Sequence, residues 1–296
     1  MRHDNGRVVK QLIVTADDFG LAPAVNEAVE QAHRRGILSA ASLMVTAPAA
    51  ADAVDRARRL PSLGVGLHLV LVDGRPALPP EQIPDLVGSD GRFPTDVTAA
   101  GINIFCRPRA RAQLEREIRA QLELFRATGL PLDHVNSHHH FHIHPTIAAT
   151  LVRLAPQYGV KAIRVPSERP IESWRTAGDR LARRLFGWIS QVPWTRSLRR
   201  QLDRAGIRAN DCVLGLSDTG DMRADRVARY LANLPEGVSE LYVHAAVERW
   251  SGPEAWPENY ACRDEFEALI DATVKATLQR AGVRPITFAA LTQAVA

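Results

Sequence analysis

Short apolar runs in this sequence alternate with longer stretches in which apolar residues recur every three or four positions. The short runs predict buried strands, and the longer stretches predict amphipathic helices. We expect strands at residues 8–15, 39–46, 64–71, 132–137, 161–165, 211–216, 239–246 and 285–288. We expect helices between them at residues 22–35, 48–60, 109–128, 146–158, 223–234 and 264–281. This alternation predicts a mostly parallel sheet with right-handed crossovers.

The expected fold class is α/β, with residues 1–296 forming one catalytic (β/α)-barrel domain. Seven or eight strands suggest a distorted or incomplete TIM-like barrel, and an open doubly wound sheet is the alternative. Residues 72–108 break the alternation because they are rich in Pro, Gly and Asp and too long for an ordinary connection. We therefore interpret them as a functional loop or lid.

The composition is that of a globular protein, with 46% hydrophobic and 24% charged residues. No run of about 18 apolar residues is present, so no membrane-spanning helix is expected. Residues 1–6 lack the apolar region of a signal peptide. The three cysteines lie far apart without a CxxC pair, which fits a reducing cytosol and argues against a thiolate metal site. We expect a cytoplasmic protein.

The net charge of +4 is concentrated in one segment. Residues 175–208 contain nine arginines and only two aspartates. The same segment has an apolar stripe at helical spacing, formed by Leu181, Leu185, Trp188 and Val192. Arginine and tryptophan beside such a stripe are typical of helices that lie in a membrane interface, where each basic residue contributes about 1 kcal/mol. We expect peripheral contact with an anionic membrane on the cytoplasmic face of the inner membrane; an ordinary barrel helix with a solvated basic face is the alternative. No nucleic-acid motif accompanies the charge.

Six of the ten histidines lie between His134 and His144. They surround the end of the predicted strand at 132–137, and Pro145 is well placed at the first position of the next helix. Alternation along the strand puts Asn136, His138 and His140 on one face. Because neutral imidazole is a common metal ligand, this clustering predicts a metal site at the mouth of the sheet. A solvated polar loop is the alternative.

Polar side chains also follow the ends of several other predicted strands. They are Asp17 and Asp18, His68, His138, Arg164 and His244. Singly, each has an ordinary explanation as a helix cap, a hydrogen-bonded core group or a salt bridge. A barrel, however, brings all these strand ends to one rim. One carboxylate and two imidazoles form a common ligand set for a divalent metal, with a second carboxylate free to act as general base and a histidine to protonate a departing amine. The set suits hydrolysis of an amide.

Three motifs together resemble the YdjC-like carbohydrate deacetylases, which include the chitooligosaccharide deacetylases. They are Thr15-Ala16-Asp17-Asp18-Phe19-Gly20, Gly66-Leu67-His68-Leu69 and the stretch from Asn136 to His142. Residues 40–45, 65–76 and 105–108 are similar to the hopanoid-biosynthesis-associated branch of that family.

The resemblance implies a (β/α) barrel with one divalent ion held by Asp18, His68 and His138, and with Asp17 as the general base. It also implies removal of an N-acetyl group from an amino sugar of the N-acetylglucosamine type, carried in this branch by a hopanoid glycolipid. The proton donor would be His244, although the family's His-Pro-Gly is replaced here by His244-Ala245-Ala246, and His140 and His142 are the other candidates. Further site residues implied are His140, His142, and Arg164 with Glu168, which contact the substrate or orient the base.

The ligand set is compatible with Zn, Mg, Mn, Co or Ni, and the sequence leaves the oligomeric state open, a homodimer included. Two other functions compete with the deacetylase hypothesis. A phosphoesterase on the same barrel would need more carboxylates to bridge two metals. A non-catalytic glycolipid-binding, membrane-associated protein would have no use for the second aspartate.

Overall fold

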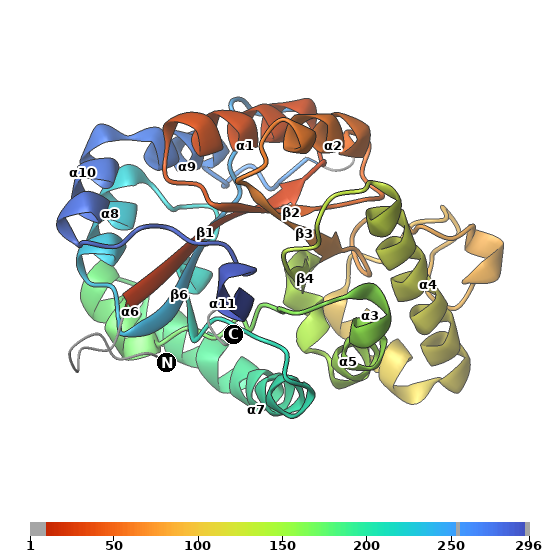
Figure 1. Ribbon diagram of the computed structural model, residues 1–296. Helices are drawn as coiled ribbons and strands as arrows, with labels where there is room; N and C mark the ends of the chain where they lie inside the picture. The colour runs from red at the N-terminus through yellow and green to blue at the C-terminus, as the bar shows by residue number, and fades with distance from the viewer. Residues whose placement is uncertain (1–9, 253–254, 294–296) are drawn as a thin grey trace.

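The computed structural model describes residues 10–252 and 255–293, and its centre is a six-stranded sheet in which all paired strands are parallel (Figure 1). The strand order is β4-β3-β2-β1-β6-β5. The strands are β1 (Lys10–Phe19), β2 (Ala40–Leu43), β3 (Gly64–Leu69), β4 (Val135–Ser137), β5 (Cys212–Leu214) and β6 (Gly237–Val243). Six of the predicted strands are therefore confirmed in type and order.

Helices surround the curled sheet on its outer side, except for the last, short one, which lies across one end of the barrel (Figure 1). They are α1 (Pro23–Arg35), α2 (Ala50–Arg58), α3 (Val97–Cys106), α4 (Pro108–Ala127), α5 (Pro145–Tyr158), α6 (Pro170–Ala177), α7 (Leu181–Ala205), α8 (Ala224–Ala232), α9 (Cys262–Ile270), α10 (Ala272–Arg280) and α11 (Ala290–Gln293). Three short 3₁₀ helices are also present: η1 (Pro80–Gln82), η2 (His138–Ile143) and η3 (Leu216–Asp218). No helix in the described ranges is long and apolar enough to cross a membrane.

The two edges of the sheet approach each other through an irregular segment at residues 161–167. Val135 of β4 forms an isolated parallel bridge with Ile163, and Ala162 forms another with Arg208. Farther along, the Val213 N–H donates to the Ser167 carbonyl at 2.8 Å. The predicted strand at 161–165 is thus reduced to single bridges. The sheet is an incomplete barrel, which confirms the predicted (β/α)-barrel class.

The C-terminal segment closes the end of the barrel opposite the strand carboxyl ends. The predicted strand at 285–288 is wrong, because Pro285 forms only an isolated bridge with Leu12 of β1. Phe288 is fully buried in a small cluster with Ile13, Ala40 and Ala162. The segment therefore acts as a plug and not as a further strand.

Two glycines of β3 leave room for polar side chains inside the barrel. A Cβ on Gly66 would lie 2.5 Å from the ring of His134, and a Cβ on Gly64 would lie 2.7 Å from the carboxyl group of Asp133. Both of these neighbours are buried. A larger residue at position 64 or 66 would displace these neighbours, so the two glycines are required by packing.

Residues 72–108 are held against α4. Glu117 accepts hydrogen bonds from the backbone N–H groups of Ala77 and Leu78, at 2.7 and 2.9 Å. Gln121, one turn further, bonds both the N–H and the carbonyl of Val70. The segment also contains η1 and α3, which the sequence pattern did not predict. It forms a wall beside the strand ends, and its role as a lid stays a prediction.

Two other helices differ from the predicted ones. The helix expected at 264–281 divides into α9 and α10 at Asp271, whose backbone is extended and whose carboxylate accepts from the Val274 N–H at 2.8 Å. In contrast, α7 continues through Pro193. A proline inside a helix removes one hydrogen bond but does not always end the helix.

Candidate functional site

The site lies at the carboxyl ends of the strands and begins with the two aspartates that end β1. The pairing of β1 with β2 shifts between Ala16 and Phe19, and Asp18 has a left-handed backbone with φ of 60°. This conformation is unfavourable for a residue with a side chain. Because of it, the Asp17 and Asp18 side chains point to different partners.

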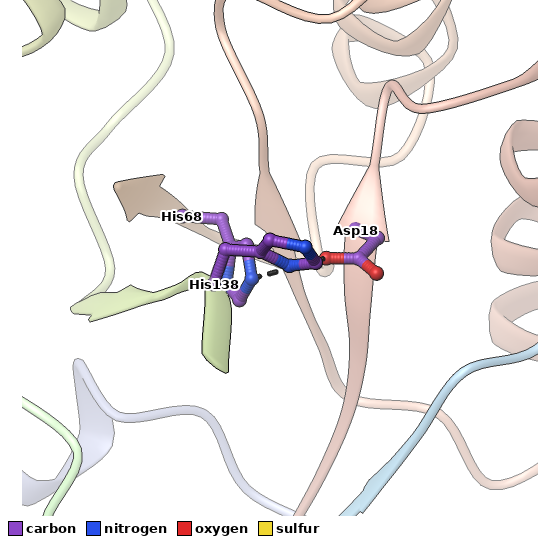
Figure 2. Close-up of side chains that lie close together, drawn as sticks. All are labelled: Asp18, His68 and His138. Carbon is purple, nitrogen blue, oxygen red and sulfur yellow. Dashed lines mark hydrogen bonds and ion pairs between the residues drawn. The ribbon is translucent and has the colours of Figure 1, made fainter. Parts of the chain in front are cut away.

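Asp18 lies against two histidines from different strands (Figure 2). Its Oδ1 atom is 3.0 Å from Nε2 of His68 in β3 and 3.1 Å from Nδ1 of His138, the residue that follows β4. One ligand atom from each of these three residues lies within 4.8 Å of the others. The predicted set is therefore brought together, in a geometry that a single cation could share.

The second oxygen of Asp18 has its own donor. The indole Nε1–H of Trp256 donates to Asp18 Oδ2 at 2.8 Å, and His244 Nε2 lies 4.0 Å from the same oxygen. Burial would raise the pKa of Asp18, but His138 and His68 outweigh it and hold this pKa well below its usual range. Asp18 is therefore a carboxylate with one oxygen directed towards the two imidazoles.

Asp17 points into the barrel and is held by Arg164. Two nitrogens of the Arg164 guanidinium donate to its two oxygens, at 2.6 and 2.9 Å. Arg164 also donates to Glu240 of β6, at 2.6 to 3.0 Å. Burial would raise the pKa of Asp17, but the charge of Arg164 outweighs it and lowers this pKa well below its usual range. Asp17 is thus an ionised, oriented carboxylate beside the histidines.

The expected association of Arg164 with Glu168 is not what the structure contains. The carboxylate partner of Arg164 besides Asp17 is Glu240. Glu168 instead accepts hydrogen bonds from Arg184 of α7 and from Ser217 of η3. It therefore anchors α7 to the strand ends, and it makes no hydrogen bond to Asp17.

The histidines after β4 turn in different directions, because His139 and His140 both have left-handed backbones. The exposed ring of His139 pairs with Asp73 at 3.1 Å. His140 borders the cavity, and burial lowers its pKa well below the usual value. His142 is fully buried, with its Nδ1 bonded to the Ser137 hydroxyl and its Nε2 to the Arg164 carbonyl. His142 therefore supports the backbone that carries Arg164 and does not reach the cavity.

His244, just after β6, faces the cavity among aromatic rings. The rings of Trp256, Tyr260 and Tyr242 have their centroids within 5.6 Å of its own. Burial lowers the pKa of His244. Within the described part of the chain, the Nδ1 atoms of His244 and His140 are buried without a hydrogen-bond partner. Two imidazoles beside the aspartates can therefore take or give a proton.

These groups line a cavity of 380 Å³. Its walls include Asp17, Asp18, three of the histidines after β4, and the aromatic group around His244. Arg75 comes from the wall formed by residues 72–108, and Arg183 and Gln191 come from α7. The size and the mixed lining suit a small polar molecule with an apolar face.

Three residues of the site were not predicted from the sequence. Asn136 bridges His68 and Asp17, and its alternation with His138 along the strand was the available signal. Glu240 is an acidic residue within an otherwise apolar strand, which is a sign of a buried partner. Trp256 lies in a connection after β6 and had no local signal.

Comparison with known proteins gives a consistent set of relatives. A family model described as YdjC-like protein matches residues 11–280. A carbohydrate deacetylase of Mus musculus is 32% identical over 298 residues, which cover 93% of this chain and 92% of that protein. A carbohydrate deacetylase of Brevibacillus brevis is 43% identical over 150 residues, 51% of this chain and 57% of that protein. The latter match therefore spans less than two thirds of the relative's length.

A solved structure supports the fold. It is that of an Enterococcus faecalis V583 protein described as a cellobiose-phosphate cleavage protein, with a TM-score of 0.75 and 24% sequence identity. The similarity covers 95% of this chain and 98% of that one. The incomplete barrel is thus an arrangement found in an experimental structure.

Proposed function

We propose that this chain, which belongs to the YdjC-like protein family, is a carbohydrate deacetylase. It would hydrolyse the N-acetyl group of an amino sugar with the help of one divalent metal ion. The observation that carries the proposal is the meeting of Asp18 with two imidazoles beside a second, oriented carboxylate, Asp17. The name carbohydrate deacetylase, given to the Mus musculus and Brevibacillus brevis relatives, supports the substrate class.

The residues fit such an ion. His68 Nδ1 bonds to the amide oxygen of Asn136 at 2.7 Å, so it must carry the proton, and its Nε2 is left as a ligand atom. We assign Asp18, His68 and His138 as the ligands, for which Zn, Mg, Mn, Co and Ni are all suitable. When bound, the ion would lower the pKa of water and polarise the amide carbonyl.

Asp17 is the group that we propose as general base. Its low pKa keeps it ionised throughout the neutral range, and Arg164 fixes the plane of its carboxylate. It can therefore accept the proton of the water that attacks the carbonyl carbon of the acetyl group. Arg164 is itself held by Glu240, so that the orientation of the base is determined by β1, β6 and the irregular segment at residues 161–167.

His244 is the group that we propose as proton donor to the departing amine. It faces the cavity across Asp18 from the histidine ligands, and its backbone N–H is held by the Glu265 carboxylate. His140 is less suitable because it lies beside Tyr242 and the charge of Arg164, which lowers its pKa further. The rings around His244 also form an apolar wall on which one face of a sugar ring could stack.

The acceptor that we propose is a hopanoid glycolipid, following the resemblance of three sequence stretches to the hopanoid-associated branch. The surface of α7 supports an amphiphilic substrate. The predicted apolar stripe turns mainly towards the protein, since Leu181, Leu185 and Val192 are half-buried. Another side of α7 is apolar and open, with Phe186 76%, Ile189 62% and Trp194 45% exposed.

This open side of α7 also carries Arg183, Arg196 and Arg200, which are exposed. Apolar tips with flanking arginines suit an anionic membrane surface. We expect sedimentation with anionic vesicles at low salt and release at high salt. The variant is Phe186→Ser with Ile189→Ser on α7, and the control is Leu124→Ser on α4, an apolar residue that is 43% exposed. Equal partitioning of all three proteins with and without vesicles would refute the membrane contact.

Acetate release tests the activity itself. With N-acetylglucosamine oligomers or a glycolipid analogue as substrate, the wild type should release acetate, and chelation should abolish the release. Asp17→Asn should lower kcat by roughly 10²- to 10⁴-fold, the usual contribution of a general base. Asp225→Asn, an exposed carboxylate on α8, is the control and should retain full activity. Activity that survives both chelation and Asp17→Asn would refute the mechanism.

A further inference from the structure

A chain of hydrogen bonds runs through the interior of the barrel from its closed end to His68. Asp133 Oδ2 lies 2.9 Å from His134 Nδ1, and His134 Nε2 lies 3.0 Å from the Ser42 hydroxyl. Asn136 Nδ2 donates to that hydroxyl at 2.9 Å, and Asn136 Oδ1 lies 2.7 Å from His68 Nδ1. All five residues are buried.

The chain has one direction, which follows from what each group can donate. Asp133 accepts from the backbone N–H groups of Phe288 and Ala289 and is an acceptor only, so the proton of His134 is on Nδ1. His134 Nε2 must then accept from the Ser42 O–H, and the Ser42 oxygen accepts from the amide of Asn136.

Two acceptors, the Ser42 hydroxyl and the Asp17 carboxylate, fix the orientation of the Asn136 amide. Its Nδ2 also donates to Asp17 Oδ1 at 3.2 Å, which an amide oxygen could not do. Its Oδ1 therefore faces His68 and requires the proton of His68 on Nδ1. Nε2 is consequently the nitrogen of His68 that faces Asp18 Oδ1, 3.0 Å away, and it is the one available to an ion.

We propose that Asp133, His134 and Ser42 are positioning residues that, through Asn136, set the tautomer of His68 and thereby raise the affinity of the site for a divalent ion. The inference rests on the metal site of the proposed function. None of the three residues touches the cavity. Gly64 and Gly66 are part of the same arrangement, because a Cβ at either position would collide with Asp133 or His134.

The chain also connects the C-terminal plug with the site. Phe288 stacks on the His134 ring with the centroids 4.5 Å apart, and the backbone of the same segment donates to Asp133. Closing of the barrel end therefore fixes the first group of the chain. Residues that hydrogen-bond to a metal-binding histidine and orient its ring typically contribute 10- to 100-fold in metal affinity.

Calorimetric titration of the chelator-stripped full chain with Zn²⁺ tests the proposal. Ser42→Ala should weaken the binding of Zn²⁺ by about 10- to 100-fold. At saturating Zn²⁺, KM for the substrate should remain that of the wild type. Ser39→Ala is the matched control. Ser39 is also buried, but its hydroxyl bonds the backbone of Val14 and takes no part in the series of hydrogen bonds that leads to His68. Equal Zn²⁺ affinity of Ser42→Ala, Ser39→Ala and wild type would overturn the proposal.

A second measurement remains decisive if Ser42→Ala does not fold. Long-range ¹H–¹⁵N spectra of the imidazoles in the metal-free wild type should show a proton on Nδ1 of both His68 and His134. A His68 ring without a proton on Nδ1 would overturn the proposal. Should the wild type bind no divalent ion, the proposed function fails, whereas these spectra still decide whether the chain sets the tautomer.

Discussion

Arg164 is the buried cation on which the orientation of the base depends, and its removal gives a sharp prediction. It is fully buried between Asp17 and Glu240, both also buried. Arg164→Met keeps an unbranched side chain of similar length but leaves two carboxylates without their cation. Removing one partner of a buried ion pair costs about 3–5 kcal/mol. For a domain of this size, a loss of about 4 kcal/mol lowers Tm by roughly 8–16 °C.

The pH dependence of this variant should have a distinctive sign. In the wild type, the pKa of Asp17 lies below its unfolded value, so this group stabilises the fold above about pH 4 and loses that contribution only in stronger acid. Without Arg164, burial dominates and raises the pKa of Asp17. Stability is then present at low pH and is lost as the pH rises, and the variant should become less stable between pH 5 and pH 8.

Urea unfolding of the metal-free proteins, followed by circular dichroism at several pH values, measures both effects. Arg153→Met is the control, because Arg153 pairs with Glu115 at the surface and should cost less than about 1 kcal/mol. Adding Glu240→Gln to Arg164→Met removes one of the two buried carboxylates that have lost their cation. The double variant should recover part of the stability without recovering activity. A free energy of unfolding within about 1 kcal/mol of the wild type at pH 7 would refute the reasoning.

Three further predictions concern groups around the site. Burial raises the pKa of Glu265 to about 7, so this group should cost the wild type about 3 kcal/mol of stability as the pH rises from 4.5 to 8. In urea unfolding, Glu265→Gln should make the free energy of unfolding less dependent on pH. The same pH dependence in the variant and the wild type would contradict the raised pKa. Trp256→Phe removes the donor to Asp18 Oδ2 and should weaken Zn²⁺ binding by about 10-fold in calorimetry, with Tm nearly unchanged. A variant that binds Zn²⁺ with the affinity of the wild type would exclude a role for the indole N–H. Asp271→Ala removes the N-cap of α10 and should cost about 1 kcal/mol in urea unfolding without altering acetate release; a loss of activity would mean that the cap also serves the site.

The approach of Asp18, His68 and His138 to one another could be predicted from the sequence because they lie at or just after strand ends. Parallel strands bring their carboxyl ends to one rim, but the choice of these three among the strand-end residues came from the resemblance to the YdjC-like family. The two-way division of the Asp17-Asp18 pair was also predicted. The left-handed backbone of Asp18, which produces it, was not.

The partners of these residues depend on tertiary contacts that no local pattern encodes. Arg164 was predicted at a strand end, but Glu240 rather than Glu168 is its second partner, since the irregular segment at residues 161–167 faces β6 inside the barrel. Trp256 reaches Asp18 from a connection without periodicity. Likewise, the interior position of His134 is visible only once Gly66 is known to lie opposite.

The predicted boundaries of the helix at 264–281 were wrong because a single residue, Asp271, divides it. The break at Asp271 depends on a capping hydrogen bond formed by a residue within an otherwise periodic stretch. No end was predicted for the helix that carries the stripe from Leu181 to Val192; α7 continues through Pro193, and Thr195, Leu198 and Leu202 beyond the proline are buried. Tertiary packing overrides the local preference in both directions.

The most direct test of the central claim is a crystal structure of the Zn²⁺-loaded protein with anomalous diffraction recorded at the zinc edge. The account predicts one anomalous peak, within bonding distance of Asp18 Oδ1, His68 Nε2 and His138 Nδ1. A loaded crystal whose zinc lies elsewhere, or whose three side chains turn away from a common point, would contradict it.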